Sequence, residues 1–88
     1  MPRRFTVKLT PSFEKDLEAL PRHEQERILA ALKRLETSPF GPPPRVKQLK
    51  SVGVGRWRLR VGFYRVRYDV VGQDVVLFRV RHRKEIYR

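Results

Sequence analysis

The 88-residue chain contains no cysteine, one methionine and only two histidines. The absence of cysteine excludes disulfide bonds and thiolate zinc sites, and two histidines are too few to predict a histidine metal centre. No apolar run approaches the roughly twenty residues that cross a bilayer, and the first residues show no signal-peptide pattern. We therefore expect a cytoplasmic protein without metal, cofactor or membrane association.

Acidic residues are also scarce, because 9 Asp and Glu stand against 21 Lys and Arg, which gives a net charge of +12. Residues 1–44 contribute about +2 of this charge and residues 45–88 about +10. A surface of this sign attracts the phosphates of nucleic acids, with an affinity that falls as salt rises. The length predicts one domain, spanning residues 1–88.

The first half of the chain predicts a strand followed by a helical hairpin. Residues 3–9 alternate apolar and polar side chains, with Phe5, Val7 and Leu9 on one face. Thr10-Pro11 has the form of a helix start, with Thr as N-cap and Pro in the first helical position. The first helix carries the apolar stripe Phe13, Leu17 and Leu20. A second helix, over about residues 22–37, carries Ile28, Leu32 and Leu35, joined by Leu29 and Ala31.

The second half predicts a meander of three antiparallel strands near residues 56–61, 63–71 and 74–81, with tight turns at Gly62 and at Gly72-Gln73. Residues 46–50 are either a turn or a short pairing segment. The two helices need an apolar surface to cover, so we expect a two-layer α+β fold with a small curved sheet. The expected helix-facing residues of the meander are Trp57, Leu59, Val66, Val76, Phe78 and Val80. Tyr64 and Tyr68 are also expected to pack in the core.

Arginine alternates with these apolar residues, so one face of the sheet should be lined with guanidinium groups. The cations expected there are Arg58, Arg60, Arg65, Arg67, Arg79 and Arg81. The planar guanidinium binds two phosphate oxygens at once, which suits a polyphosphate ligand. For Arg67 and Arg79 a structural alternative is an ion pair with Asp69 or Asp74.

Four segments resemble the RelE/ParE superfamily of bacterial and archaeal toxin–antitoxin systems. They are Leu49-Lys50 with the glycine loop after it, Arg56-Trp57-Arg58-Leu59-Arg60, Gly62-Phe63-Tyr64-Arg65-Val66-Arg67-Tyr68, and His82-Arg83-Lys84-Glu85-Ile86-Tyr87-Arg88. The resemblance covers nearly the whole chain. It implies either a RelE-like enzyme that cleaves mRNA in the ribosomal A site without a metal, or a ParE-like inhibitor of DNA gyrase. It also implies an antitoxin partner.

The resemblance implies phosphate contacts for Arg56, Arg58, Arg60, Arg65 and Arg83, and a role as base or stacking residue for Tyr87. His82 is a possible acid, because histidine is the side chain whose ordinary pKa lies near neutrality. The candidate catalytic set is therefore Arg58, Arg65, His82, Arg83 and Tyr87, and the candidate phosphate-binding set is Lys47, Lys50, Arg56, Arg60, Arg67, Arg81 and Lys84. Family members often carry lysine on the strand where this chain has Arg56 and Arg58. Arginine does not release its proton in proteins, so the general base falls to Tyr87 or His82, or catalysis rests on electrostatics alone. Many members also end in a further helix, which we do not expect here.

Three functions fit these features. The first is a toxin that cleaves mRNA on the ribosome, with ribosome, mRNA and a cognate antitoxin as partners in a hetero-oligomeric system. The second is a gyrase-inhibiting toxin without nuclease activity, which the arginines at the family's lysine positions keep open. The third is a plain RNA-binding module. For a toxin we expect the antitoxin on the helical hairpin and on the basic face.

Overall fold

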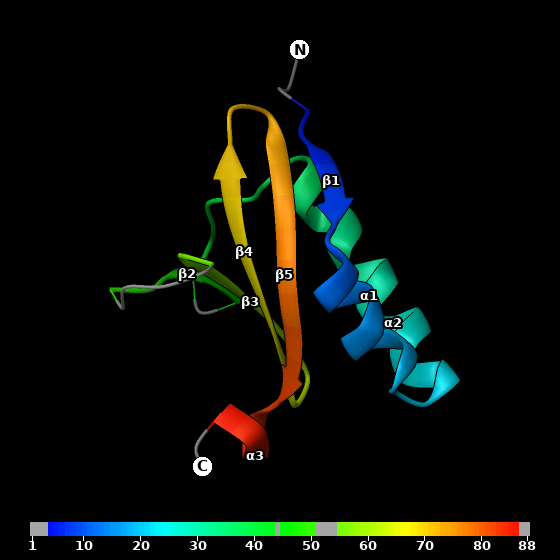
Figure 1. Cartoon of the computed structure of the whole chain (residues 1–88). Coiled ribbons are helices and arrows are strands. Elements are labelled where there is room, and N and C mark those ends of the chain that lie inside the picture. The colour runs from blue at the N-terminus through cyan, green and yellow to red at the C-terminus, as the bar shows by residue number, and fades with distance from the viewer. Residues whose placement is uncertain (1–3, 44, 51–54, 87–88) are drawn as a thin grey trace.

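The computed structural model describes residues 4–43, 45–50 and 55–86, and their side chains as far as residue 84. Its centre is a five-stranded sheet of order β1-β5-β4-β3-β2, in which only the β1–β5 pair is parallel. The helices α1 and α2 lie together on one side of this sheet (Figure 1). The strands are β1 Thr6–Leu9, β2 Val46–Gln48, β3 Trp57–Val61, β4 Tyr64–Val71 and β5 Asp74–His82. The α+β class predicted from the sequence is confirmed.

Helix α1, Pro11–Glu18, begins where the sequence predicts. The hydroxyl oxygen of Thr10 accepts a hydrogen bond from the Phe13 N–H at 3.2 Å, and Pro11 occupies the first turn. The same hydroxyl donates to the carbonyl of Leu77 in β5 at 2.8 Å. The helix start is thereby fixed to the sheet as well as capped. Phe13 and Leu17 are buried, as expected.

Helix α2 spans Arg22–Leu32 and continues as the 3-10 turn η1, Lys33–Glu36. The predicted single helix over residues 22–37 therefore tightens in its last turn, as helix ends often do. Ile28, Leu32 and Leu35 are buried, which confirms the predicted stripe. Leu29 is 44% exposed, so its assignment to the core is wrong.

Residues 46–48 form a strand and not a turn, because β2 pairs antiparallel with β3. The predicted meander of three strands therefore has four, and β1 adds a parallel strand at the opposite edge. Glycine opens both tight turns of the meander, with φ of +58° at Gly62 and +61° at Gly72. These conformations suit a residue without a Cβ.

A β-bulge in β5 changes which residues face the helices. Arg67 pairs with Arg79, but the next residue, Tyr68, pairs with Leu77, so Phe78 is an extra residue in the ladder. The bulge shifts the alternation by one position. Val75 and Leu77 are fully buried, whereas Val76 and Phe78 are not. The prediction that Val76 and Phe78 face the core is therefore wrong.

The core extends from the helices across the sheet. Leu59 and Val66 pair across β3 and β4, Val66 pairs with Val80 on its other side, and all three are buried. Tyr68 is fully buried, as predicted, and its hydroxyl donates to the carbonyl of Pro39 at 2.7 Å. Burial raises the pKa of the Tyr68 hydroxyl above its ordinary value. Trp57 is half-buried and packs against this core. Its ring and that of Phe40 meet edge to face, with 5.2 Å between the ring centroids.

The chain forms a helical turn directly after β5. This turn, α3, spans Arg83–Ile86, and the sequence pattern did not predict it. The N–H of Arg83 donates to the carbonyl of Phe63 at 2.6 Å, which fixes the start of α3 to the β3–β4 turn. In the described part of the chain no helix is both long and apolar enough to cross a membrane.

Candidate nucleic-acid interface

Rows of basic side chains cross the sheet on the face opposite the helices. The cross-strand register places them side by side, and directly opposed residues have Cβ atoms about 5 Å apart. The first row consists of Lys47, Arg58, Arg67 and Arg79, and the second of Arg60, Arg65 and Arg81. The structure confirms the predicted arginine-lined face, because the arginines occupy alternate positions of the strands and so lie on one face of the sheet.

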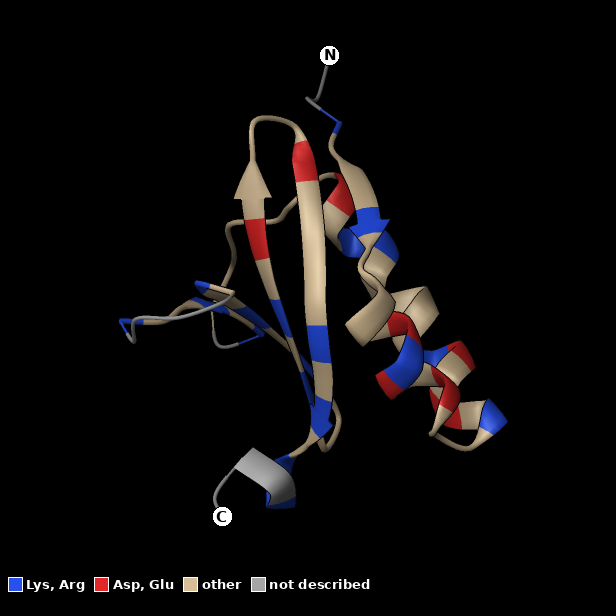
Figure 2. Cartoon of the chain, viewed as in Figure 1, with Lys and Arg blue, Asp and Glu red and all other residues tan. Residues whose placement is uncertain are grey.

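The second row continues onto the segment before β2, because the N–H of Arg60 donates to the carbonyl of Arg45 at 2.8 Å. Arg45 was not among the predicted site residues, although its position two residues before Lys47 is the signal that could have included it. In Figure 2 the basic residues of β4 and β5 occupy the halves of these strands that lie nearer α3, while acidic residues are prominent on α1 and α2. The cations of β4 and β5 are thus gathered at one end of these two strands.

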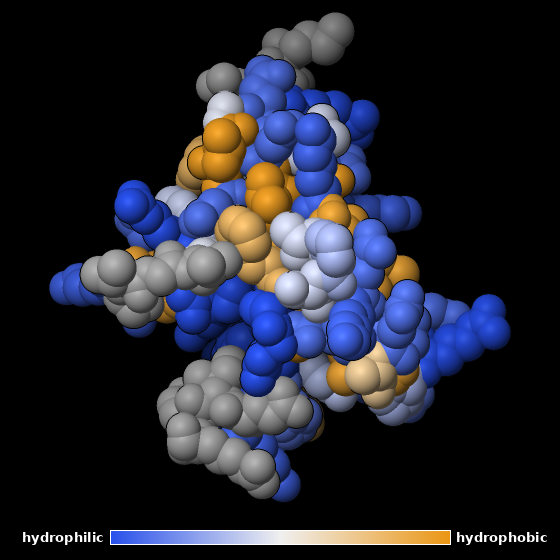
Figure 3. All heavy atoms as spheres, viewed as in Figure 1, coloured by the Kyte–Doolittle hydropathy of each residue, from blue (hydrophilic) through white to orange (hydrophobic). Residues whose placement is uncertain are grey.

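The space-filling view shows the same division. Hydrophobic side chains gather over the halves of β4 and β5 near their connecting turn, and hydrophilic side chains surround the end near α3 (Figure 3). Val71, at the hydrophobic end, is 64% exposed. A ligand of the basic face would therefore lie across the α3 end of the sheet.

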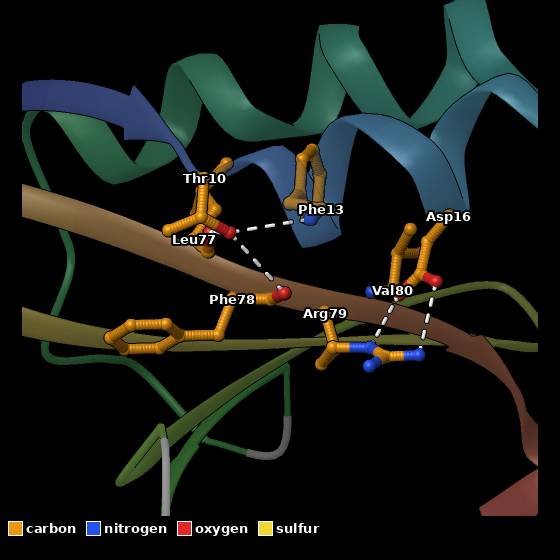
Figure 4. Close-up of polar contacts among 7 residues, drawn as sticks. All are labelled: Thr10, Phe13, Asp16, Leu77, Phe78, Arg79 and Val80. Carbon is orange, nitrogen blue, oxygen red and sulfur yellow. Dashed lines mark hydrogen bonds and ion pairs between the residues drawn. The ribbon is translucent and has the colours of Figure 1, made fainter.

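Arg79 has a structural partner on α1. Its Nε donates to Oδ2 of Asp16 at 2.8 Å and its Nη2 donates to Oδ1 at 3.2 Å (Figure 4). The same carboxylate accepts the backbone N–H of Val80 at 3.1 Å. The expected pairing of Arg79 with Asp69 or Asp74 is therefore wrong. Asp16 instead fixes α1 along the part of β5 that β1 does not cover.

Arg67 also has a partner other than the predicted carboxylates. Its Nε and Nη2 both donate to the carbonyl of Gly55, at 2.9 and 2.6 Å. Asp69, two residues along β4, accepts the backbone N–H of Arg56. Two side chains of β4 thus hold the peptide units at which β3 begins. These contacts fix the backbone directly before Arg58 and Arg60, the cations of β3.

Gly55 has the backbone that this arrangement requires. Its φ is +83°, and a Cβ there would lie 2.9 Å from the Cβ of Arg67 and 3.1 Å from the N of Tyr68. A side chain at this position would separate the carbonyl of Gly55 from the guanidinium that binds it. The glycine is therefore required by backbone conformation and by close packing together.

Arg65 lies at the β3–β4 turn, where its Nη1 donates to the carbonyls of Tyr64 at 3.1 Å and Gly62 at 3.3 Å. Its neighbours in the same row, Arg60 and Arg81, are exposed, whereas Arg58 in the first row is half-buried. The guanidinium of Arg65 is thereby oriented by the turn beside two exposed cations. Such a cluster can hold two or more phosphate oxygens at once.

His82 lies on the other face of the sheet. It pairs with Tyr64, in the row next to Val66 and Val80, while its neighbour Arg81 faces the opposite way. The His82 ring contacts the rings of Phe63, at 6.1 Å between centroids, and of Tyr64, at 5.3 Å. Its Nδ1 accepts the N–H of Lys84 in α3 at 3.1 Å. The structure therefore separates this ring from the arginine rows and connects it to α3.

The remaining predicted residues surround the rows. Arg83 and Lys84 are exposed on α3, Lys47 is exposed on β2, and Lys50 and Arg56 are exposed at either side of the loop between β2 and β3. Tyr87 lies outside the described residues. Together with the two rows, these cations form one basic region that runs from β2 to α3.

Comparison with known proteins places this chain in a family. The family model described as the ParE toxin of the type II toxin–antitoxin system parDE matches residues 7–87 of this chain. Toxin RelE3 of Methanocaldococcus jannaschii is 33% identical over 82 residues, which cover 92% of this chain and 93% of that protein. Toxin RelG of Mycobacterium tuberculosis is 36% identical over 88 residues, with 96% and 97% covered.

A solved structure shows the same similarity in three dimensions. A chain in the RelB–RelE antitoxin–toxin complex from Methanococcus jannaschii matches with a TM-score of 0.69 at 31% identity, over 90% of this chain and 93% of that one. The shared fold and the length of the match define the class of protein, a toxin of a type II toxin–antitoxin system. The chain belongs to the RelE/ParE toxin superfamily.

Proposed function

We propose that this toxin is a metal-independent endoribonuclease that cleaves mRNA in the ribosomal A site and so stops translation. The observation that carries the proposal is the second arginine row, in which Arg60, Arg65 and Arg81 stand side by side on three paired strands. Two relatives that match nearly the whole chain are toxins with Rel names, RelE3 and RelG, which supports the RelE-like function over a plain RNA-binding module.

The reaction needs charge stabilisation above all. The 2′-hydroxyl of one nucleotide gives up its proton and its oxygen attacks the adjacent phosphorus, the bond from phosphorus to the 5′-oxygen breaks, and that oxygen takes a proton from water. The products are a cyclic 2′,3′-phosphate and a free 5′-hydroxyl. Negative charge increases on the phosphate oxygens in the transition state. In this proposal Arg58, Arg65 and Arg83 bind those oxygens, and strands hold the first two rigidly. The surrounding cations, Lys47, Lys50, Arg56, Arg60, Arg81 and Lys84, bind the flanking phosphates.

Proton transfer requires a group other than arginine, because arginine keeps its proton. We propose Tyr87 as the base that accepts the 2′-hydroxyl proton, which is one of the roles that the resemblance implies for it. His82, the possible acid, has its Nδ1 occupied by the N–H of Lys84. We therefore assign His82 as a positioning residue, which holds α3 and with it Arg83.

The second candidate is inhibition of DNA gyrase, and the observation that favours it is the match to the ParE toxin model. In either case we propose an acidic antitoxin as partner in the cytoplasm. The related Methanococcus chain is part of an antitoxin–toxin complex, and an acidic partner would neutralise much of the net charge of +12.

Primer extension on mRNA in a purified translation reaction, with and without the toxin, tests the proposal. Cuts within A-site codons that disappear when ribosomes are omitted are the expected result. Intact mRNA, combined with loss of supercoiling by purified gyrase, would contradict the nuclease proposal and support the second candidate.

A further inference from the structure

A second basic feature lies between α2 and the edge of β3. Two adjoining cavities, of about 420 and 280 Å³, share Arg34, Arg45 and Arg60 in their linings. The larger also includes Arg27 of α2 and the backbone of Gly62. We call this feature the arginine groove and define it by Arg27, Arg34, Arg45 and Arg60.

Because Gly62 has no side chain, the guanidinium of Arg27 can pack against its backbone and form one side of the groove. A Cβ on Gly62 would lie 2.8 Å from Nη2 of Arg27 and 3.0 Å from its Cζ. The guanidinium of Arg27 therefore lies directly against the β3–β4 turn. This contact joins the helix layer to the strand that carries Arg60 and gives the groove a defined shape.

The groove concentrates positive charge without an opposing carboxylate. Both linings consist of arginine, alanine, proline, valine and glycine residues, with no Asp or Glu. The ion pairs found among the described side chains are Lys8–Asp74, Arg22–Glu26, His23–Glu24 and Arg79–Asp16, so none of them uses a groove arginine. Clustered like charges repel one another, and an anionic ligand relieves that repulsion.

We propose that the arginine groove binds the phosphate backbone of RNA and extends the basic face of the sheet around its edge. This inference rests on the proposed function, since Arg60 belongs both to the groove and to the second arginine row. Because of that shared residue, one RNA chain can follow a continuous line of guanidinium groups. Arginine is suited to this task because its planar fork binds two oxygens of one phosphate.

The lining favours a nucleic acid over a docked protein helix. An amphipathic helix needs a hydrophobic groove to receive its apolar side chains. The apolar residues here are Ala30, Ala31, Pro42, Pro43 and Val61, and none of them presents a large aliphatic or aromatic surface. The groove therefore offers charge and hydrogen-bond donors, with little hydrophobic area.

The salt dependence of RNA binding tests this proposal. The probe is a fluorescent single-stranded oligoribonucleotide with 2′-O-methyl sugars, which has no 2′-hydroxyl to attack and so cannot be cleaved. We compare the full chain with an Arg27→Gln/Arg34→Gln double variant and with the matched control Arg22→Gln/Lys33→Gln. The control removes the same charge from exposed positions of α2 and η1 that do not line the groove.

Loss of two phosphate contacts should reduce the slope of log affinity against log salt by about 1.4, since each contact with single-stranded RNA contributes roughly 0.7. The control should keep the wild-type slope. An unchanged slope in the groove variant would overturn the proposal. So would a groove variant that binds RNA normally but no longer binds polyglutamate, because the groove would then select an acidic polypeptide.

Two features keep this test decisive. Circular dichroism melting shows whether the double variant is folded. If the double variant is unfolded, Arg45→Gln replaces it, because Arg45 lines the groove but lies outside the helices; this variant should reduce the slope of log affinity against log salt by about 0.7. The probe reports binding alone. Absence of mRNA cleavage by the wild type would therefore contradict the proposed function without contradicting RNA binding by the arginine groove. Normal cleavage by the wild type, combined with an unchanged salt slope in the groove variant, would contradict RNA binding by the groove alone.

Discussion

Arg67 and Arg79 are direct neighbours across the β4–β5 ladder, yet each guanidinium has a different structural role. Arg67 binds the carbonyl of Gly55, and Arg79 binds Asp16. The alternation of the sequence predicts that both lie on one face, but it cannot give their partners. Asp16 is 63 residues away from Arg79, and a backbone carbonyl leaves no mark in a sequence.

The role of His82 can be separated from that of a proton donor by two substitutions. His82→Asn places an amide oxygen near the position of Nδ1 and can still accept the N–H of Lys84. It should cleave mRNA within a few-fold of the wild-type rate. His82→Ala removes the acceptor and should lose roughly 10- to 100-fold as α3 shifts. Equal losses in the two variants would contradict the assignment, because they would show that the acceptor for the Lys84 N–H does not matter.

Tyr68 makes stability depend on pH in the alkaline range. Burial raises the pKa of its hydroxyl in the folded state, so the native protein holds this proton more tightly than the unfolded chain does. Its contribution is complete below the ordinary tyrosine pKa of about 10 and is lost as pH rises through the folded value. Above pH 10 the free energy of unfolding should fall by up to about 1.4 kcal/mol per pH unit.

Urea unfolding below and above pH 10, compared between wild type and Tyr68→Phe, measures the contribution of the Tyr68 hydroxyl to the free energy of unfolding. The other titrating groups are common to both proteins. The variant should lose less stability at alkaline pH. At neutral pH it should be about 1–2 kcal/mol less stable, since the carbonyl of Pro39 loses its donor. Parallel alkaline losses in the two proteins would contradict this assignment.

At the scale of elements, hydrophobic periodicity predicted most of the architecture and failed where the backbone departs from regular geometry. The N-cap at Thr10 and the helix stripes follow from local chemistry, so they could be predicted. The bulge at Phe78 could not, because one extra residue reverses the faces of Val76 and its neighbours without changing the sequence pattern. Pairing of β2 depends on contact with β3, which residues 46–50 alone do not reveal.

Substitution of two glycines tests how β3 is anchored. Gly55→Ala should destabilise the fold by about 2–3 kcal/mol, because it combines a positive φ with close contacts to Arg67 and Tyr68. Gly72→Ala is the matched control, with a φ of +61° and no atom within 4 Å of the added Cβ. It should lose only about 1 kcal/mol. Equal losses in chemical denaturation would show that the contacts at Gly55 do not matter.

Asp16 tests the attachment of α1 to the sheet. Asp16→Asn weakens the two hydrogen bonds from Arg79 and the one from Val80, in a half-buried position. The free energy of unfolding should fall by about 1–3 kcal/mol. Asp74→Asn removes the exposed ion pair with Lys8 and should change it by less than about 1 kcal/mol. Thermal melting of both variants distinguishes these expectations, and a larger loss for Asp74→Asn would contradict them.

Over the whole molecule, the helix layer carries mixed charge and the sheet carries an excess of cations. Acidic residues are prominent on α1 and α2, and cations line the halves of β4 and β5 near α3 (Figure 2). The uneven charge of the two halves predicted this basic sheet. It did not predict the arginine groove, because Arg27 and Arg34 lie on a helix of mixed charge that resembles an ordinary solvated surface.

The cleavage rate of Arg65→Ala in a purified translation reaction tests most directly whether the basic face is a catalytic site. Removal of one donor that stabilises transition-state charge should lower the rate by roughly 100-fold or more. The control Lys33→Ala removes one exposed cation from η1 and should cleave at the wild-type rate. A folded Arg65→Ala protein that cleaves mRNA as fast as this control would contradict the assignment of the arginine rows as the site of catalysis.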